Sequence, residues 1–354
     1  MTLENLGWND QLQNYWEANP LYPNGLLGRI YRLNRNHAWV VSDDQTSQAI
    51  IPSQSVSLEC YPCVGDWCVL ADQPGNTSAG RIVSILTRRN QLRRKRAGRK
   101  SEAQVLAANV DEVFVLTSRI KEFSWNRLER YLTMIRNEQI TPVICLTKTD
   151  LDPDPPATER LLASRFDGVQ VVSISNVTGF GIEALRQQLA SPGTRILVGS
   201  SGVGKSTLTN HLLNSECRAT RTVRNADARG RHTTSGSEMF QLSPSGWLID
   251  SPGLRELEPW DAGNGLTDTF TEIMALTKRY RFRNCHHDSE SGCAVQAALE
   301  DGRLEAGTLA NFQKLQREQA RQETKASRDS ETRRRQRDKF HAKLLRRTLK
   351  DKGR

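Results

Sequence analysis

Short apolar runs alternate with Asn, Asp, Gly and Pro through the first quarter of the chain. Between Gly28 and Leu86 five such runs occur, at residues 29–33, 38–41, 49–51, 66–70 and 81–86. Several short strands at this spacing predict a small β-barrel, and five strands suit an OB-fold. Residues 1 to about 24 are polar and aromatic, and we expect a short helix there that leads into the barrel.

From Ala107 onward the pattern changes to apolar runs that alternate with amphipathic segments. We expect strands at 113–116, 142–146, 169–172, 195–198 and 247–250, and helices at 125–137, 159–166 and 182–189. This alternation predicts a parallel sheet with helices on both faces. Nucleotide sites in such sheets lie at the carboxyl ends of the strands.

The run at 195–198 leads into a complete P-loop and the helix after it. Its residues are Gly199, Ser200, Ser201, Gly202, Val203, Gly204, Lys205, Ser206 and Thr207. The glycines let backbone N–H groups turn toward phosphate oxygens, and the helix presents its positive end to the anion. We expect Lys205 to reach the β- and γ-phosphates and to act in catalysis, and the Ser206 hydroxyl to bind Mg²⁺.

A second phosphate motif follows the P-loop. Asp250-Ser-Pro-Gly253 closes an apolar strand, as an aspartate that holds Mg²⁺ does, and the Gly253 amide is placed to meet the γ-phosphate. Between the two motifs, Gly230-Arg-His-Thr-Thr234 offers a threonine hydroxyl to complete the Mg²⁺ shell once the γ-phosphate orders the loop. We favour Thr234 over Thr233 for this role.

Guanine recognition is predicted after the strand at 142–146. Guanine specificity normally comes from Asn-Lys-x-Asp, and this chain has Thr147-Lys-Thr-Asp150. The Asp150 carboxylate can accept both N1–H and N2–H of guanine, and Lys148 would lie along the base. Thr147 departs from the usual asparagine. After the next strand, Ser175-Asn176 resembles the start of a Ser-Ala-Lys loop that backs the base.

The order of these motifs is unusual, because the guanine motifs at 147 and 175 precede the phosphate motifs at 199, 230 and 250. This is the order of a circularly permuted GTPase. Together with Gly65-Asp-Trp67 and Ala107-Ala-Asn-Val-Asp111, the chain resembles the RsgA family of ribosome-small-subunit-dependent GTPases. The resemblance implies an OB domain, a permuted GTPase core, a zinc-binding domain, and a role in late maturation of the small ribosomal subunit.

The resemblance also implies a zinc site of pattern Cys-x4-Cys-x-His-x5-Cys. Here Cys285, His287 and Cys293 match, whereas Tyr280 stands where the first cysteine is expected. A structural zinc site normally has four ligands, so His286 or a nearby carboxylate substitutes, or the site has been lost. Without zinc, the domain would be a helical one held by its own apolar packing.

Slow intrinsic hydrolysis is expected from the residue after Asp250-Ser-Pro-Gly253. Leu254 stands where many GTPases place a water-orienting glutamine, and an apolar side chain cannot position water. His232 is the candidate that would orient the attacking water. Stimulation by the ribosomal subunit would then supply or order the missing group.

Basic residues are concentrated in two segments of the chain. Residues 311–354 hold 16 of the 50 Lys/Arg and 6 of the 40 Asp/Glu, an excess equal to the net +10 of the whole chain. Residues 88–100 hold eight basic residues and no acidic one, and we expect this segment to meet solvent or a polyanion rather than to pack. An OB barrel beside a basic strip favours contact with rRNA; a solvated linker and a solvated tail are the alternatives.

The cysteines and the hydropathy of the chain indicate the cellular compartment in which the protein works. The seven cysteines are scattered, which disfavours a secreted disulfide framework, and Cys60-x-x-Cys63 is a weak zinc signal against thiols that simply pack. No apolar run approaches a membrane span. We therefore expect a soluble, cytoplasmic protein without a membrane partner, most simply a monomer.

The sequence thus predicts a multidomain chain with an N-terminal extension at 1–24, an OB-fold domain with a basic linker at 25–102 and a permuted α/β P-loop GTPase domain at 103–262. A C-terminal, zinc-binding or helical domain at 263–310 and a basic helical tail at 311–354 follow. The predicted activity is hydrolysis of GTP to GDP, with Mg²⁺ and one Zn²⁺ bound. The alternatives are a nonspecific NTPase and a non-catalytic RNA-binding module that uses nucleotide only as a switch.

Overall fold

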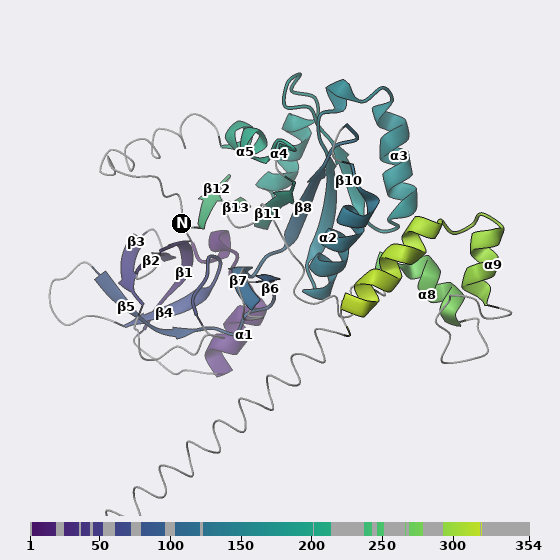
Figure 1. Ribbon diagram of the computed structural model, residues 1–354. Helices are drawn as coiled ribbons and strands as arrows, with labels where there is room; N and C mark the ends of the chain where they lie inside the picture. Colours follow the sequence, from purple (N-terminus) through teal and green to yellow (C-terminus); the bar gives the residue numbers. More distant parts are fainter. Residues whose placement is uncertain are drawn as a thin grey trace, which may run out of the picture. The chain divides into compact units, whose positions relative to one another are not determined.

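The protein is described from a computed structural model (Figure 1), in which the chain divides into two compact units, residues 1–259 and 260–354. The described residues are 2–18, 25–34, 37–42, 45–51, 61–71, 79–95, 103–120, 123–200, 202–213, 237–242, 246–250, 266, 269–278, 293–318 and 320. Within these ranges, no helix is both long and apolar enough to cross a membrane.

Five strands near the N-terminus close into a ring. They are β1 (Leu26–Leu33), β2 (His37–Ser42), β3 (Gln45–Ile50), β4 (Trp67–Ala71) and β5 (Ala79–Ile85). They pair in the order β1-β2-β3-β5-β4 and β4 returns to β1, with β3 and β5 parallel and the other pairs antiparallel. Each apolar run of this region overlaps one of these strands. Alternate residues such as Ile30, Val40 and Leu70 fill the interior, as period-2 alternation requires.

The N-terminal segment packs against this ring and against the strand that contains Trp247. It contains the short helix η1 (Glu4–Leu6) and the helix α1 (Asp10–Ala18), so the predicted helix is present. Leu6 is fully buried, and the Trp8 ring meets the Trp67 ring edge-on with centroids 4.8 Å apart. The Trp247 indole N–H also donates to the Asn5 carbonyl at 2.7 Å.

Arg29 on β1 connects four segments of the first unit. Its side chain is buried, and its guanidinium donates to the carbonyls of Leu6, Gly65 and Asn109 and to the Thr194 hydroxyl, the last at 2.9 Å. Burial lowers the pKa of Arg29 to about 10, so the group is still charged at neutral pH. The Arg29 guanidinium thus donates hydrogen bonds to four segments. They are the N-terminal segment, the turn before Trp67, the linker (residues 86–111) and the P-loop strand.

The Gly65-Asp-Trp67 motif forms a turn against the linker. Gly65 has φ +92°, and a Cβ there would lie 2.1 Å from the Ala108 carbonyl oxygen, so only glycine fits. The fully buried Asp66 carboxylate accepts two hydrogen bonds from Arg88, at 2.7 and 2.8 Å, and one from the Cys63 N–H at 2.8 Å. A buried carboxylate held by a guanidinium fork in this way fixes the turn.

The basic segment at 88–100 packs over its first half, which corrects the expectation that it must lie in solvent or on a polyanion. Gln91–Lys95 forms β6, which pairs antiparallel with β7 (Ala103–Ala108), and Leu92 is fully buried. Three arginines pair with carboxylates: Arg88 with Asp66, Arg89 with Asp111, and Arg93 with Glu138. Acidic partners distant in the sequence make this packing possible, which local charge counting cannot detect.

The predicted parallel sheet follows. Its strands are β8 (Glu112–Thr117), β9 (Thr141–Leu146), β10 (Gln170–Ser173), β11 (Gly193–Gly199) and β13 (Gly246–Asp250), with β12 (Glu238–Gln241) antiparallel to β13. Their order is β10-β9-β8-β11-β13-β12, and β12 also pairs with β1, so the sheet is continuous with the ring. The P-loop strand β11 is therefore central, with parallel neighbours on both sides.

Helices cover both faces of this sheet (Figure 1). On one face, Val113 and Val115 of β8 pack with α2 (Trp125–Asn137) and α3 (Pro155–Arg165). On the other, Phe114 and Leu116 pack with α4 (Ile182–Ala190) and α5 (Lys205–Leu212). The predicted bounds of α2 are confirmed. α3 begins at Pro155 instead of Glu159, because the Asp154 carboxylate caps it by accepting from the Ala157 N–H at 3.0 Å.

The second unit is helical. It contains α8 (Thr271–Lys278), α9 (Ala294–Glu300) and a helix over residues 306–318. Their apolar faces share one buried cluster, in which the rings of Phe270 and Phe312 meet edge-on at 5.4 Å. The expected domain boundary at 310 falls inside the last helix, and Leu315 beyond it is buried in the same cluster.

Candidate nucleotide-binding site

The P-loop occupies the carboxyl end of β11, at the start of α5. Gly199, Gly202 and Gly204 all have positive φ, at +146°, +80° and +104°. A Cβ on Gly199 would lie 2.5 Å from the Leu116 carbonyl oxygen, so the strand can turn here only without a side chain. Val203 is buried in the core beneath the loop. The loop is thereby anchored while its glycines leave the backbone free to curve around an anion.

The side chains of the P-loop differ in their contacts. The Lys205 ammonium donates to the carbonyls of Gly199 and Ser200, the latter at 2.6 Å, which places it over the loop. Ser206 and Thr207 on the first turn of α5 are exposed. Ser201 lies outside the described residues.

The predicted guanine motif lies at the end of β9, two strands from β11 in the sheet order. Asp150 is exposed, and its Oδ1 accepts the hydroxyl proton of the buried Ser175, which follows β10. Ser175 Oγ in turn accepts from the N–H groups of Val177 and Thr178, at 3.2 and 3.1 Å. Lys148 adopts a left-handed conformation, with φ +59°. Ser175 therefore orients the Asp150 carboxylate and shapes the loop behind it.

The two guanine loops also reach the P-loop. The Thr147 hydroxyl is buried and lies 2.9 Å from the Val203 carbonyl oxygen. The Asn176 amide nitrogen lies 3.3 Å from the Gly204 carbonyl oxygen. Thr147 and Asn176 thus contact two consecutive carbonyls of the turn that leads into α5.

The predicted magnesium ligands lie on one edge of the sheet. Asp250 ends β13, which runs parallel to β11, and it is exposed, as is Ser206. A hydroxyl and a carboxylate are oxygen ligands of the kind that Mg²⁺ prefers, so these residues fit the ion. Thr234, Thr233, Gly253 and His232 lie outside the described residues.

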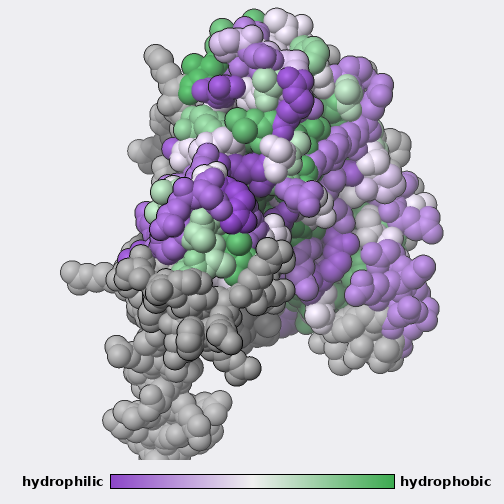
Figure 2. Space-filling view, turned by 90° about the vertical axis from the view of Figure 1, so that its right-hand side faces the viewer, coloured by the Kyte–Doolittle hydropathy of each residue, from purple (hydrophilic) through white to green (hydrophobic). Residues whose placement is uncertain are grey.

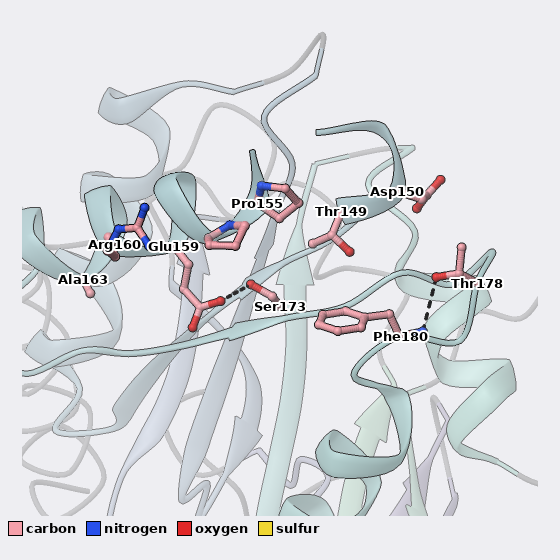
Figure 3. A pocket seen from close by; sticks show the side chains of 10 residues that line it. Thr149, Asp150, Pro155, Glu159, Arg160, Ala163, Ser173, Thr178 and Phe180 are labelled. Carbon is pink, nitrogen blue, oxygen red and sulfur yellow. Dashed lines mark hydrogen bonds between the residues drawn. The ribbon is translucent and has the colours of Figure 1, made fainter. Parts of the chain in front are cut away.

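A cavity of about 600 Å³ lies beside Asp150, between α3 and the loop that follows β10 (Figure 3). Asp150 is the one predicted nucleotide residue in its described lining, so this cavity is distinct from the phosphate site. Inside it, Ser173 Oγ donates to Glu159 Oε2 at 2.6 Å. Its other lining residues are Thr149, Pro155, Pro156, Arg160, Ala163, Thr178 and Phe180.

One exposed hydrophobic side chain, Phe180, lines this cavity. Among the described residues, the exposed large hydrophobic ones are Leu26, Tyr61, Leu151, Leu161, Val177 and Phe180, and four of these fall between 151 and 180. The face shown in Figure 2 is mostly hydrophilic, with hydrophobic residues in smaller patches. Scattered hydrophobic side chains of this kind are normal on a protein surface.

Comparison with known proteins decides the family. A protein from Opitutus terrae, named small ribosomal subunit biogenesis GTPase RsgA, is 37% identical over 333 residues, which cover 90% of each chain. Small ribosomal subunit biogenesis GTPase RsgA 2 from Listeria monocytogenes is 36% identical over 354 residues, 99% of each chain. The sequence profile of the RsgA GTPase family matches residues 85–260. This chain belongs to the RsgA GTPase family.

Solved structures agree on the fold of this RsgA-family protein. YjeQ from Thermotoga maritima aligns with a TM-score of 0.62 at 24% identity, over 84% of this chain and 99% of that one. YloQ, described as a circularly permuted GTPase, aligns with a TM-score of 0.56 at 25% identity, over 82% and 93%. Here the guanine loops follow β9 and β10 and the P-loop follows β11, so the permuted order predicted from the motifs is confirmed.

The zinc site implied by the RsgA resemblance stays a prediction. Tyr280, Cys285, His286 and His287 lie outside the described residues, whereas Cys293 is buried just before α9. In the described part of the chain, no group of three His, Cys, Asp or Glu side chains could hold a metal ion.

The cysteines of the ring favour packing over zinc. Cys63 and Cys68 are buried, and burial together with the nearby Asp66 carboxylate raises the pKa of both thiols. Cys60 lies outside the described residues.

The RsgA motifs that sequence reasoning left without a role are structural. Asp111 holds the end of the linker next to β11. Its Oδ2 accepts from the Thr194 N–H at 2.7 Å, and its Oδ1 accepts from Arg89. Asn109 has φ +54°, and its amide donates to the Gly65 carbonyl. An asparagine between two predicted strands is the sequence signal that could have indicated such a turn, because asparagine adopts positive φ more readily than most residues.

Proposed function

We propose that this RsgA-family GTPase binds the small ribosomal subunit and couples GTP hydrolysis to late maturation of the subunit or release of assembly factors. The observation that carries the proposal is the arrangement of Ser175, Asp150 and the P-loop at one edge of a sheet with permuted motif order. Relatives named small ribosomal subunit biogenesis GTPase match along 90% or more of the chain. That name supports the ribosomal partner.

Guanine recognition is assigned to Asp150 with Ser175 behind it. An ionised carboxylate accepts about four hydrogen bonds, so the bond from Ser175 leaves acceptor sites for N1–H and N2–H of guanine. Adenine carries no donor pair at these positions. Lys148 would lie along the base, and Thr147 and Asn176 would support the loops. This set favours a guanine nucleotide over the alternative of a nonspecific NTPase.

Phosphate transfer is assigned to the P-loop and to β13. The backbone N–H groups of Gly199 to Thr207 would surround the phosphates, and Lys205 would compensate the charge that develops on the γ-phosphate. Ser206 and Asp250 would hold Mg²⁺ with Thr234, and Gly253 would contact the γ-phosphate. When bound, Mg²⁺ supplies charge neutralisation at the transferring group. His232 is proposed to orient water, because Leu254 cannot.

Contact with rRNA is assigned to the ring and to the basic segments. Closure of five strands in the order β1-β2-β3-β5-β4 supports an OB-fold, a frequent nucleic-acid platform. Residues 96–100 and 321–354, rich in Lys and Arg, lie outside the described residues and are proposed as phosphate contacts from charge alone. One Zn²⁺ at Cys285, His287 and Cys293 remains part of the proposal, as does a monomeric state.

The decisive experiment is GTP turnover with and without purified small subunits. We expect the subunits to stimulate hydrolysis, GTP to outcompete ATP for a fluorescent GDP analogue, and Lys205→Ala to reduce turnover about 100-fold or more. Arg160→Ala removes an exposed positive charge from α3 and should leave turnover unchanged.

Three outcomes would contradict the proposal in different ways. Equal competition by ATP would indicate a nonspecific NTPase. Nucleotide binding without hydrolysis, even with subunits present, would favour a non-catalytic module. Normal turnover in Lys205→Ala would mean that the P-loop is not the active site.

A further inference from the structure

Two side chains join the guanine loops to the turn of the P-loop. Thr147 follows β9 and Asn176 follows β10, and they reach the neighbouring carbonyl groups of Val203 and Gly204. These carbonyls immediately precede Lys205, the first residue of α5. These two contacts therefore link the predicted base site to the phosphate site directly.

Thr147 alone provides at most one hydrogen bond to the P-loop turn. The Thr147 oxygen lies 2.9 Å from the Val203 carbonyl and 3.1 Å from the Thr117 carbonyl. A hydroxyl has a single proton, so it donates to one of these oxygens at a time. An asparagine amide at this position would present two protons. The chain thus has one donor fewer after β9 than an Asn-Lys-x-Asp motif provides.

Asn176 supplies an amide donor from the neighbouring loop. A Cβ on Gly204 would lie 2.8 Å from the Asn176 amide nitrogen, so the lack of a side chain at Gly204 leaves room for this contact. The amide orientation is fixed by chemistry, because the opposite orientation would place two oxygens together.

The contact uses only the amide nitrogen of Asn176. Its Oδ1 is buried and has no hydrogen-bond partner among the described residues. The described hydrogen bonding of this side chain therefore runs through Nδ2 to the Gly204 carbonyl.

We propose that Asn176 is a positioning residue that compensates for Thr147: the two side chains together hold the guanine loops at a fixed distance from the P-loop. The inference rests on the proposed function, because the ligand that spans both sites is a guanine nucleotide. A nucleotide that bridges two fixed loops binds without having to order them first. Loosening the tie therefore shortens the residence time of GDP.

The test is the rate at which a fluorescent GDP analogue dissociates from the full chain. Loss of one hydrogen bond changes an equilibrium about two- to tenfold, and we expect Asn176→Ala to speed dissociation by this factor. Thr147→Asn in the Asn176→Ala background restores the missing donor and should return the rate to near the original value. Val177→Ala, at a neighbouring position that is 83% exposed, is the matched control and should change nothing.

Thermal unfolding without nucleotide separates positioning from a structural role. Asn176→Ala removes one hydrogen bond together with a buried Oδ1 that has no partner among the described residues, so the two effects oppose each other and the melting temperature should change little. A clear fall in melting temperature would assign Asn176 to structure, and an unchanged dissociation rate or a lack of rescue by Thr147→Asn would overturn the proposal. Failure of the unaltered protein to prefer GDP over ADP would instead reject the proposed function.

Discussion

Arg88 and Arg89 are neighbours in the sequence but occupy different environments. The Arg88 side chain is 11% exposed and its partner Asp66 is 0% exposed, whereas Arg89 and Asp111 are 38% and 35% exposed. A buried charge is strongly destabilising without its partner, but an exposed pair contributes little because water screens it. The two arginines should therefore differ greatly in their effect on stability.

Arg88→Met should lower the free energy of unfolding by about 3 to 5 kcal/mol, because it leaves the Asp66 carboxylate buried and uncompensated. Arg89→Met is the matched control and should cost about 1 kcal/mol or less. Urea unfolding followed by tryptophan fluorescence measures both. Equal urea midpoints for the two variants would show that the Asp66 pair does not stabilise the turn.

Single residues were predictable where their requirement is local. The need for glycine in the P-loop could be predicted from the sequence because the turn itself requires it, and Gly199, Gly202 and Gly204 all have positive φ. The tie from Asn176 to Gly204 could not, because it joins loops 28 residues apart. The same holds for Arg88, whose acidic partner lies 22 residues earlier in the sequence. Charge and spacing alone do not encode such pairings.

At the scale of elements, apolar periodicity predicted the interior strands and α2 well. Errors occurred where a polar contact or a pairing partner decides the boundary. The Asp154 cap starts α3 four residues before the predicted position. β6 is rich in arginine, and its strand conformation depends on pairing with β7, which periodicity does not show.

The turn before β4 offers a test at this scale. Gly65→Ala would put a Cβ at φ +92°, 2.1 Å from the Ala108 carbonyl oxygen, so both backbone strain and a clash oppose it. Gly168→Ala is the control, since it has φ +71° but open space around its Cβ. Left-handed strain alone costs about 1 to 2 kcal/mol, which is the loss expected for Gly168→Ala.

Gly65→Ala should exceed that loss clearly, because the Ala108 carbonyl is backbone and cannot move aside. Urea unfolding of both variants, with GDP affinity measured in parallel, checks this expectation. A Gly65→Ala protein no less stable than the Gly168→Ala protein would mean that the turn can shift away from the linker.

At the scale of the molecule, the ring and the GTPase sheet of the first unit are joined by buried polar contacts as well as by β1 and β12. Arg29 donates to acceptors in the N-terminal segment, the ring, the linker and β11. A guanidinium buried among fixed acceptors favours one arrangement of these segments. The sequence predicted the ring and the sheet separately, but not this joint, because its acceptors are mostly backbone carbonyls.

The basic tail is the remaining feature at this scale, and we predict that it contributes to affinity for the small subunit through rRNA phosphates. Ending the chain after Asp329 removes 11 Lys/Arg and 3 Asp/Glu while it keeps the helix over residues 306–318. GDP affinity should be unchanged, because the guanine and phosphate motifs all precede residue 254. Subunit affinity should fall most at low salt.

Salt dependence distinguishes a phosphate-binding tail from a solvated one. For each phosphate that the truncated protein no longer neutralises, the slope of log affinity against log salt concentration should become shallower by roughly 0.7 to 0.9. Intact and truncated proteins are therefore titrated against small subunits at several salt concentrations. A tail that binds rRNA gives a shallower slope after truncation, since fewer counterions are released. Superimposable titrations would show that the tail stays in solvent and that the rest of the chain holds the subunit.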